Sequence, residues 1–462
     1  MKWIGIILFI PIILFAHPVD IKAKKLLWEN DQIKLIDDIS LSHPLGYLQA
    51  GYAELNHVDK SNGLSFDTGC LEKKVVLSLH DSSRFECDKA LIDNTLNHIQ
   101  LFATAAKPIL FYSPIHDKPM TIRCLFAQGD YASLAVPIKK AKDHFHHIFF
   151  KNDVVMEYDQ FIIKSDEATY EITTDLNKIL HLKSASHCEI NYGKDRMLCL
   201  SATCHLNQQL FYLNSPKGSI DSPFFSSDNS FIFSCKKLCV EKSRQTLTLQ
   251  QNVCISNPEL GEIEAEELLL KRNESGELQH IMTKGKSRIY FQQGSKNPCI
   301  LSCSEDILID HQKHIIEANR FGSKMSDKPL FFSDNQISVF ANTATLNYKN
   351  QDGKLKLQDI LLDGNVYFFF SDKIKLPGYG LAHKIYYNLE TNELVLTKGD
   401  AKVIFCKEDN TMKLEADTIY VYPNSEKENE TIKASGIAHF SFSLEEQNYI
   451  REMFTKYLKQ HP

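Results

Sequence analysis

The chain has 462 residues, of which 43% are hydrophobic and 24% are charged, so it is long enough for two or more domains or for one repeat body with a sizeable core. Its 52 Lys and Arg against 58 Asp and Glu give a net charge of −6, and no basic stretch dominates, which argues against nucleic acid as the main partner. The 28 Phe and 18 Tyr against 2 Trp are typical of a β-rich protein.

The N-terminus carries an apolar run. Lys2 precedes residues 3–16, a run shorter than the about 20 apolar residues that a transmembrane helix needs. A charged start, a short apolar run and the small residue Ala16 at its end describe a secretory signal peptide. We therefore expect residues 1–16 to be a leader and the protein to lie in the periplasm or cell envelope. The alternative is a leader that is kept as a membrane anchor.

The rest of the chain divides into four segments by pattern. They are an N-terminal β-rich block at 17–138, a middle β block at 139–330, a block with the cleanest repeats at 331–442, and a helical segment at 443–462. In the first block, a helix is possible near 88–106. In the last, Ser443-Leu-Glu-Glu matches a helix capping box, and apolar residues follow at helical spacing. We expect this helix to close one end of the sheet or to serve as a docking element.

The 12 cysteines are an even number, and some could pair in an oxidising compartment. The close pairs Cys235/Cys239 and Cys299/Cys303 are each four residues apart, which is about 13 Å along an extended strand. A disulfide needs Cα atoms within about 7 Å, and thiolates held apart make a poor zinc site. We expect several of the cysteines to be small buried residues, and no metal site.

Four glycines each precede a short segment in which every second residue is mostly apolar. Gly364, for example, precedes Val366, Phe368 and Phe370; the other phrases begin at Gly285, Gly399 and Gly436. A period of two after a glycine predicts a strand that leaves a turn with one apolar face. The recurrence predicts an all-β fold of repeated short strands in which each unit completes its core against the next.

A second phrase reads apolar-x-small-x-x-apolar-x-apolar. Copies begin at Leu48, Ile263, Val339 and Leu414, and weaker ones at Phe85 and Ile163. The small residue and the next apolar residue are three apart, so a flat strand would place them on opposite faces. A bulge or sharp bend between them would return both to one face; the alternative is a short helix. Hairpin signals follow at 273–276, 350–353, 390–392 and 423–425.

Catalytic patterns are absent from the sequence. It contains neither a Gly-x-Ser-x-Gly elbow nor a His-Glu-x-x-His motif. His144, His146 and His147 cluster without a matching carboxylate or thiol spacing, so a polar strand face or loop is favoured over a metal site. We expect a protein that is not an enzyme and has no cofactor and no catalytic residues.

Several phrases carry a family resemblance. Leu414–Val421, Ile432–Gly436 and Ala438–Phe442 resemble the OstA-like family of lipopolysaccharide-transport proteins, as do Val339–Tyr348 and Leu361–Val366. The resemblance covers about 331–442 well and 250–330 less well. It implies an elongated, twisted antiparallel β-jelly-roll that is partly open and holds acyl chains inside. It also implies partners: lipopolysaccharide or another acylated lipid, and other envelope transport proteins joined end to end through β-strands.

A set of apolar positions would line such a groove. They share the inward parity of the repeats: Val366, Phe368, Phe370, Ile385, Tyr387, Val403, Phe405, Ile419, Val421, Phe440 and Phe442. Lipid relay requires these side chains to be reachable by acyl chains. Two other functions stay open: a structural or adhesive β-solenoid that acts through protein contacts, and an envelope hydrolase whose site is assembled from distant residues.

Overall fold

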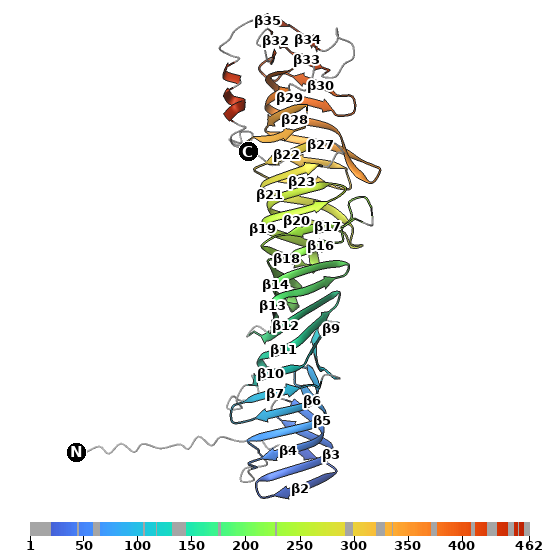
Figure 1. Ribbon diagram of the computed structural model, residues 1–462, viewed down its shortest axis with the longest axis vertical. Helices are drawn as coiled ribbons and strands as arrows, with labels where there is room; N and C mark the ends of the chain where they lie inside the picture. Colours follow the sequence, from blue (N-terminus) through green and yellow to red (C-terminus); the bar gives the residue numbers. More distant parts are fainter. Residues whose placement is uncertain are drawn as a thin grey trace, which may run out of the picture. The chain divides into compact units, whose positions relative to one another are not determined.

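A computed structural model gives the fold of the chain, and its strands are labelled in Figure 1. It describes residues 20–43, 46–58, 65–104, 107–116, 118–131, 145–173, 177–226, 229–291, 299–319, 329–334, 336–370, 377–407, 412–422, 432–441, 448–450 and 452–456. The chain forms two compact units, residues 1–193 with 198–211 (unit 1) and residues 194–197 with 212–462 (unit 2). The described residues contain 35 strands, and residues 448–450 and 452–456 are helical. The predicted all-β fold with a C-terminal helix is confirmed.

The strands of unit 1 form an antiparallel sheet. They are β1 (Ile21–Lys22), β2 (Lys25–Glu29), β3 (Gln32–His43), β4 (Gly46–Asn56), β5 (Thr68–Leu79), β6 (Arg84–Asp93), β7 (His98–Phe102), β8 (Ile109–Ile115), β9 (Lys118–Cys124), β10 (Phe126–Tyr131), β11 (Phe145–Tyr158), β12 (Phe161–Ile172) and β13 (Lys178–Tyr192). Strands β14 (Asp195–His205) and β15 (Leu210–Asn214) are each divided between the units, and the 3₁₀ turn η1 (Leu206–Gln208) belongs to unit 1.

The strands of unit 2 are also paired antiparallel. They are β16 (Lys217–Ile220), β17 (Phe231–Ser234), β18 (Lys237–Glu241), β19 (Thr246–Asn257), β20 (Gly261–Arg272), β21 (Leu278–Phe291), β22 (Cys299–Cys303), β23 (Ile307–Asp310), β24 (Ile315–Ala318), β25 (Leu330–Ser333), β26 (Ile337–Ala341), β27 (Thr343–Gln351), β28 (Lys354–Phe370), β29 (Gly378–Asn388), β30 (Glu393–Thr397), β31 (Val403–Lys407), β32 (Lys413–Ala416), β33 (Thr418–Val421), β34 (Ile432–Ser435) and β35 (His439–Ser441), with the 3₁₀ turn η2 (Lys242–Arg244).

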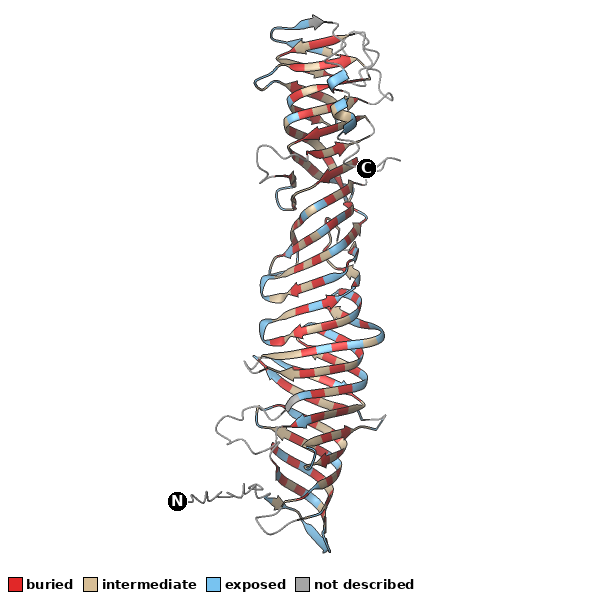
Figure 2. Cartoon of the chain, turned by 90° about the vertical axis from the view of Figure 1, so that its left-hand side faces the viewer, coloured by how far each residue is buried: buried red, intermediate tan, exposed pale blue. Residues whose placement is uncertain are grey.

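The long strands cross a corner and so belong to two half-sheets. In unit 1, β6 pairs with β7 through residues 89–93 and with β8 through residues 84–86. In unit 2, β28 pairs with β27 through its first part and with β26 through its last part. We call the half-sheets A (β7 and β10 in unit 1, β27, β30 and β33 in unit 2) and B (β8 and β9 in unit 1, β26, β31 and β32 in unit 2). Burial alternates along these strands, so each half-sheet has one apolar face (Figure 2).

The predicted bend lies at this corner. The register between β5 and β6 shifts between the pairs Glu72↔Lys89 and Val75↔Cys87, and Cys87 and Ala90 are both buried. Ala265 and Leu268 of β20 are likewise both buried on either side of a register shift. The small residue therefore ends one half-sheet and the apolar residue three positions later begins the other. The alternative of a short helix is wrong.

The repeat glycines differ from the prediction in one respect. Gly285 and Gly364 lie inside β21 and β28, at the corner, and do not follow a hairpin turn. Their φ angles are +74° and +79°, a backbone conformation that glycine adopts without steric cost. A Cβ on Gly285 would lie 2.6 Å from Oε2 of Glu266, because the neighbouring strand turns the same corner there. These strands are therefore longer than predicted; β28 has 17 residues.

Other local expectations have mixed outcomes. The helix considered near 88–106 is absent: β6 and β7 occupy this stretch, because its apolar residues alternate with a period of two. The hairpin turns at 273–276, 350–353 and 390–392 connect consecutive strands as expected, whereas 423–425 lies outside the described residues. The predicted boundaries at 138 and 442, the capping box at 443–446 and the leader at 1–16 also lie outside them, and the boundary at 330 stays a prediction.

The C-terminal helix packs on the outer face of half-sheet B in unit 2. Ile450 is 2% exposed and packs with Tyr379 and Cys406. The ring of Phe454 lies 5.3 Å from that of Phe340 and 5.6 Å from that of Phe369. Figure 1 shows the helix beside β28 and β29. It covers a sheet face, and so the expectation that it closes the end of the sheet is wrong.

Candidate functional site

Most of the predicted groove residues face the interior of unit 2, between the half-sheets. Nine of the eleven are at most 1% exposed: Val366, Phe368, Phe370, Ile385, Tyr387, Val403, Phe405, Ile419 and Val421. Phe440 pairs through its backbone with Leu414, and Phe442 lies outside the described residues. The period of two therefore placed these side chains on one buried face.

The interior aromatic rings pack on glycines. Gly380 of β29 lies between Phe368 of β28 and Phe405 of β31 in the sheet register. A Cβ on Gly380 would lie 2.6 Å from Cζ of Phe368, and one on Gly378 would lie 2.7 Å from Cζ of Phe405. A Cβ would also clash with the carbonyl oxygen of Ile404 at Gly380 and lie 2.6 Å from that of Cys406 at Gly378, so glycine leaves room for both the rings and the neighbouring backbone.

The rings fill the interior in this conformation. The centroids of Phe368 and Phe370 lie 5.3 Å apart, and that of Phe405 lies 6.4 and 6.0 Å from them. All three side chains have no exposed surface. The half-sheets are therefore closed on a packed core, and a bound chain would require them to separate.

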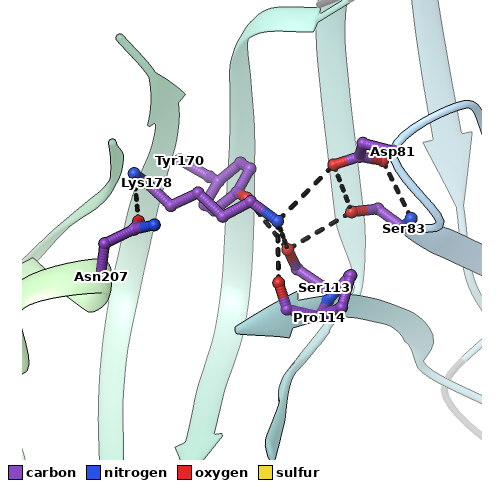
Figure 3. A network of polar contacts seen from close by, with 7 residues as sticks. All are labelled: Asp81, Ser83, Ser113, Pro114, Tyr170, Lys178 and Asn207. Carbon is purple, nitrogen blue, oxygen red and sulfur yellow. Dashed lines mark hydrogen bonds and ion pairs between the residues drawn. The ribbon is translucent and has the colours of Figure 1, made fainter. Parts of the chain in front are cut away.

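The half-sheets are joined by polar contacts along the line where their hairpin ends meet, opposite the corner. We call this line the seam. In unit 1, Lys178 at the start of β13 in half-sheet A reaches half-sheet B (Figure 3). Its Nζ donates hydrogen bonds to Oγ of Ser113 at 3.0 Å and to the carbonyl oxygen of Pro114 at 2.9 Å, and it lies 3.7 Å from a carboxylate oxygen of Asp81.

Hydroxyl groups complete this network. The Ser113 Oγ lies 3.0 Å from the hydroxyl of Tyr170 and 3.3 Å from Oγ of Ser83. Ser83 also donates to the carboxylate of Asp81 through its backbone N–H and its hydroxyl, at 2.9 and 2.8 Å. Ser83, Ser113 and Tyr170 are at most 1% exposed. We call Lys178, Asp81, Ser83, Ser113, Pro114 and Tyr170 together the Lys178 latch.

A second contact joins the seam of unit 1. Nε2 of His43, at the end of β3 in half-sheet B, lies 2.8 Å from Oδ1 of Asn94 in half-sheet A. The hydroxyl of Tyr131 donates to the same Oδ1 at 2.6 Å. Burial lowers the pKa of His43 to about 4, so the ring is neutral at pH 7.

The seam of unit 2 contains a buried ion pair. Arg272, at the end of β20 in half-sheet A, donates two hydrogen bonds to the carboxylate of Asp195 in half-sheet B, at 3.0 and 2.9 Å. Its Nε donates to Oγ of Ser222 at 2.7 Å. The side chains of Arg272 and Asp195 are 9% and 2% exposed. The bidentate geometry suits the planar guanidinium group.

The hydroxyl of one predicted groove residue also reaches the seam. Tyr387 of half-sheet A donates to Oδ2 of Asp334 in half-sheet B at 3.1 Å. The other carboxylate oxygen of Asp334 accepts from the backbone N–H groups of Gln336 and Ile337. Burial raises the pKa of Asp334 above its usual value.

The seam was not predicted from the sequence, although the sequence contains a signal for it. In β8, Ser113 falls in the inward series Ile109, Phe111 and Ile115, and in β20 Arg272 follows Leu268 and Leu270 at the same parity. A polar residue at an inward position near the end of a strand marks a contact between half-sheets. Its partner cannot be read from local pattern, because the partner is 65 or 77 residues away.

Other features of the described residues carry no comparable arrangement. A hollow of about 620 Å³ lies on the outer face of unit 2, beside Ile232, Glu262 and Tyr290. No three His, Cys, Asp or Glu side chains of the described residues are placed to hold a metal ion. All 12 cysteines are described and unpaired, and most are buried, as expected of small apolar residues.

No protein-family model matches the sequence, and no curated protein matches it. Within the described parts of the chain, none of the helices combines the length and the apolar character that crossing a membrane requires.

Proposed function

We propose that the chain binds the acyl chains of lipopolysaccharide, or of another acylated lipid, between the half-sheets of unit 2 and relays them within the cell envelope without catalysing a reaction. The observation that carries the proposal is the continuous inward apolar face that runs across strands β28, β29, β30, β31 and β33. The leader expected at residues 1–16 and the resemblance to OstA-like transport proteins support the same location and substrate.

Binding requires the half-sheets to separate, and burial of the acyl chain offsets the free-energy cost of that separation. Each buried CH₂ group contributes about 0.8 kcal/mol, so a long acyl chain replaces many of the contacts that the rings of Phe368, Phe370 and Phe405 lose. When the seam opens, its polar groups become accessible to water. Hydrogen bonds to water then replace the broken contacts, which limits the free-energy cost of opening. The charged part of the lipid stays outside the seam in water.

A second function is favoured by a different observation. The interior rings have no exposed surface and pack against one another as in an ordinary β-sandwich core. Strand β2 exposes Leu26, Leu27 and Trp28. A structural or adhesive envelope protein that acts through strand edges would have these same features.

Photo-crosslinking in cells separates the two functions. A photoreactive amino acid replaces Phe368 or Phe405 in the full chain, and the control replaces Tyr367, whose side chain is on the opposite face of β28. Lipid relay predicts lipopolysaccharide adducts from the two interior positions and few from Tyr367. Adducts at none of the interior positions, with a folded protein, would exclude relay through this interior and leave the structural role.

A further inference from the structure

Unit 1 has an aromatic interior of its own, outside the predicted groove residues. Phe85 and Phe111 project from half-sheet B, and Phe150 and Tyr170 project from half-sheet A. The ring centroids of Phe85 and Phe111 lie 4.5 Å apart, and Phe111 lies 5.4 Å from Phe150 and 5.3 Å from Tyr170. All four side chains are at most 1% exposed. This interior has the chemistry of the one in unit 2.

The Lys178 latch lies directly over this interior. Ser113 follows Phe111 on the same face of β8, and its hydroxyl contacts the hydroxyl of Tyr170, one of the four rings. Lys178 spans from half-sheet A to Ser113 and Pro114 in half-sheet B (Figure 3). Opening the seam at this place therefore exposes the rings and the ammonium group together.

The contacts of Lys178 can be exchanged for those of an anion. Its hydrogen bonds to Ser113 and Pro114 go to uncharged oxygens, and the carboxylate of Asp81 is farther away at 3.7 Å. That carboxylate makes its shorter contacts with Ser83. An anionic group that entered the seam would form a charge-assisted hydrogen bond to the ammonium, and such bonds are shorter and stronger than those to neutral oxygens.

We propose that the Lys178 latch is a binding site for an anionic amphiphile, with its head group on Lys178 and its chain between Phe85, Phe111, Phe150 and Tyr170. The inference rests on the proposed function, because it assumes that half-sheets of this fold separate for acyl chains. Beyond that function, it specifies a second binding compartment in unit 1, a negatively charged head group, and Lys178 as the residue that binds this group. The side chain of Lys178 is 14% exposed, so an arriving head group can contact it at the seam.

Fluorescence titration of the full chain tests the site with three probes of equal chain length. They are a fluorescent long-chain fatty acid, the corresponding alkyl phosphate and the methyl ester of the acid. We expect the acid or the phosphate to bind at least about tenfold more tightly than the uncharged ester, and their order tells a carboxylate site from a phosphate site. Lys178→Met should remove this preference, and Lys178→Arg should retain it.

Two further variants define the role of charge. Asp81→Asn removes the competing carboxylate, so we expect tighter binding of the anionic probes and unchanged binding of the ester. Lys164→Met is the matched control, since Lys164 forms an exposed ion pair with Glu189 at 3.2 Å on the outer face of unit 1; its affinities should equal those of the wild type. Circular dichroism checks that each variant is folded.

Two results would overturn the proposal: equal affinity of the wild type for the ester and the anionic probes, or wild-type affinity for the acid in folded Lys178→Met. The first comparison needs no variant, so it decides even if a substitution prevents folding. These failures are distinct from failure of the proposed function. That function is tested by adducts at Phe368 and Phe405 in unit 2, and it stands if the ester binds as well as the acid.

Discussion

At the scale of single residues, Arg272 and Asp195 form a deeply buried ion pair at the seam of unit 2. Taking both groups out of water is costly, and the two hydrogen bonds between them compensate for it. Removing one partner leaves the other charge buried and unpaired. The pair therefore makes the closed state depend on a contact between strands that are distant in the sequence.

Replacement of Arg272 by Met should lower the free energy of unfolding of unit 2 by about 3–5 kcal/mol, because the carboxylate of Asp195 would remain buried without a counter-charge. Urea denaturation followed by tyrosine fluorescence measures the change. Lys284→Met is the control, since Lys284 and Glu267 form an exposed pair worth at most about 1 kcal/mol. Equal effects of the two substitutions would show that the seam pair does not hold the half-sheets together.

The buried ring of His43 predicts a loss of stability in acid. Its folded pKa of about 4 lies below the unfolded value of 6.5, so the unfolded chain binds the proton first as the pH falls. The stabilisation is complete above pH 6.5 and is lost through the window down to pH 4, by about 3 kcal/mol in all. His43→Gln keeps a hydrogen-bonding side chain opposite Asn94 and should flatten this dependence. Urea midpoints measured from pH 7 to pH 4.5 check it; an unchanged slope in the variant would contradict it.

The sequence predicts which side chains turn inward, but it does not predict which side chains they contact there. Val366, Phe368 and Phe370 are two apart, and strand geometry alone puts them on one face. Lys178 and Ser113 meet only because β8 and the start of β13 belong to opposite half-sheets of a bent sheet. That relation depends on the order and length of the intervening strands, which no local pattern contains.

At the scale of elements, the C-terminal helix and the outer face of half-sheet B form a local apolar contact. Phe340, Phe369 and Tyr379 are outward positions that a solvated sheet face would fill with polar residues. The helix covers them with Ile450 and Phe454. The capping box and spacing predicted the helix. Its position was not predictable, because apolar residues at both parities of a strand indicate that the outer face is covered but do not indicate which segment covers it.

Substitution of Ile450 by Ala should detach this helix from the sheet. Ile450 is 2% exposed, and loss of a buried Ile side chain costs about 2–5 kcal/mol, which is more than a helix of about two turns retains by itself. Hydrogen exchange should then increase in residues 448–456 and at Tyr379, while β13 keeps its protection. Tyr449→Ala is the control, since Tyr449 is 57% exposed. Protection of the helix that survives Ile450→Ala would show that other contacts hold it.

At the scale of the whole molecule, the first strands of unit 1 and the last strands of unit 2 have unpaired edges among the described strands. Strand β2 pairs with β3 alone, and β34 pairs with β33 alone. An edge strand presents free N–H and C=O groups, and proteins usually protect such edges with charge or bulges. Leu26, Leu27 and Trp28 instead make the β2 edge apolar, as a strand-pairing partner would require.

The edge at β2 should form the contact with another envelope transport protein that the proposed relay needs. A photoreactive amino acid at the position of Trp28 is expected to give a protein adduct in cells, because a partner strand would lie about 5 Å from β2. Leu26→Lys with Leu27→Lys should abolish the adduct, since lysine at an edge disfavours pairing without unfolding a strand whose side chains are already exposed. Ile162→Lys changes an exposed apolar residue away from the edge and should leave the adduct intact. If the double substitution leaves adduct yield unchanged, the partner binds elsewhere, and the exposed leucines are a local feature of the first hairpin.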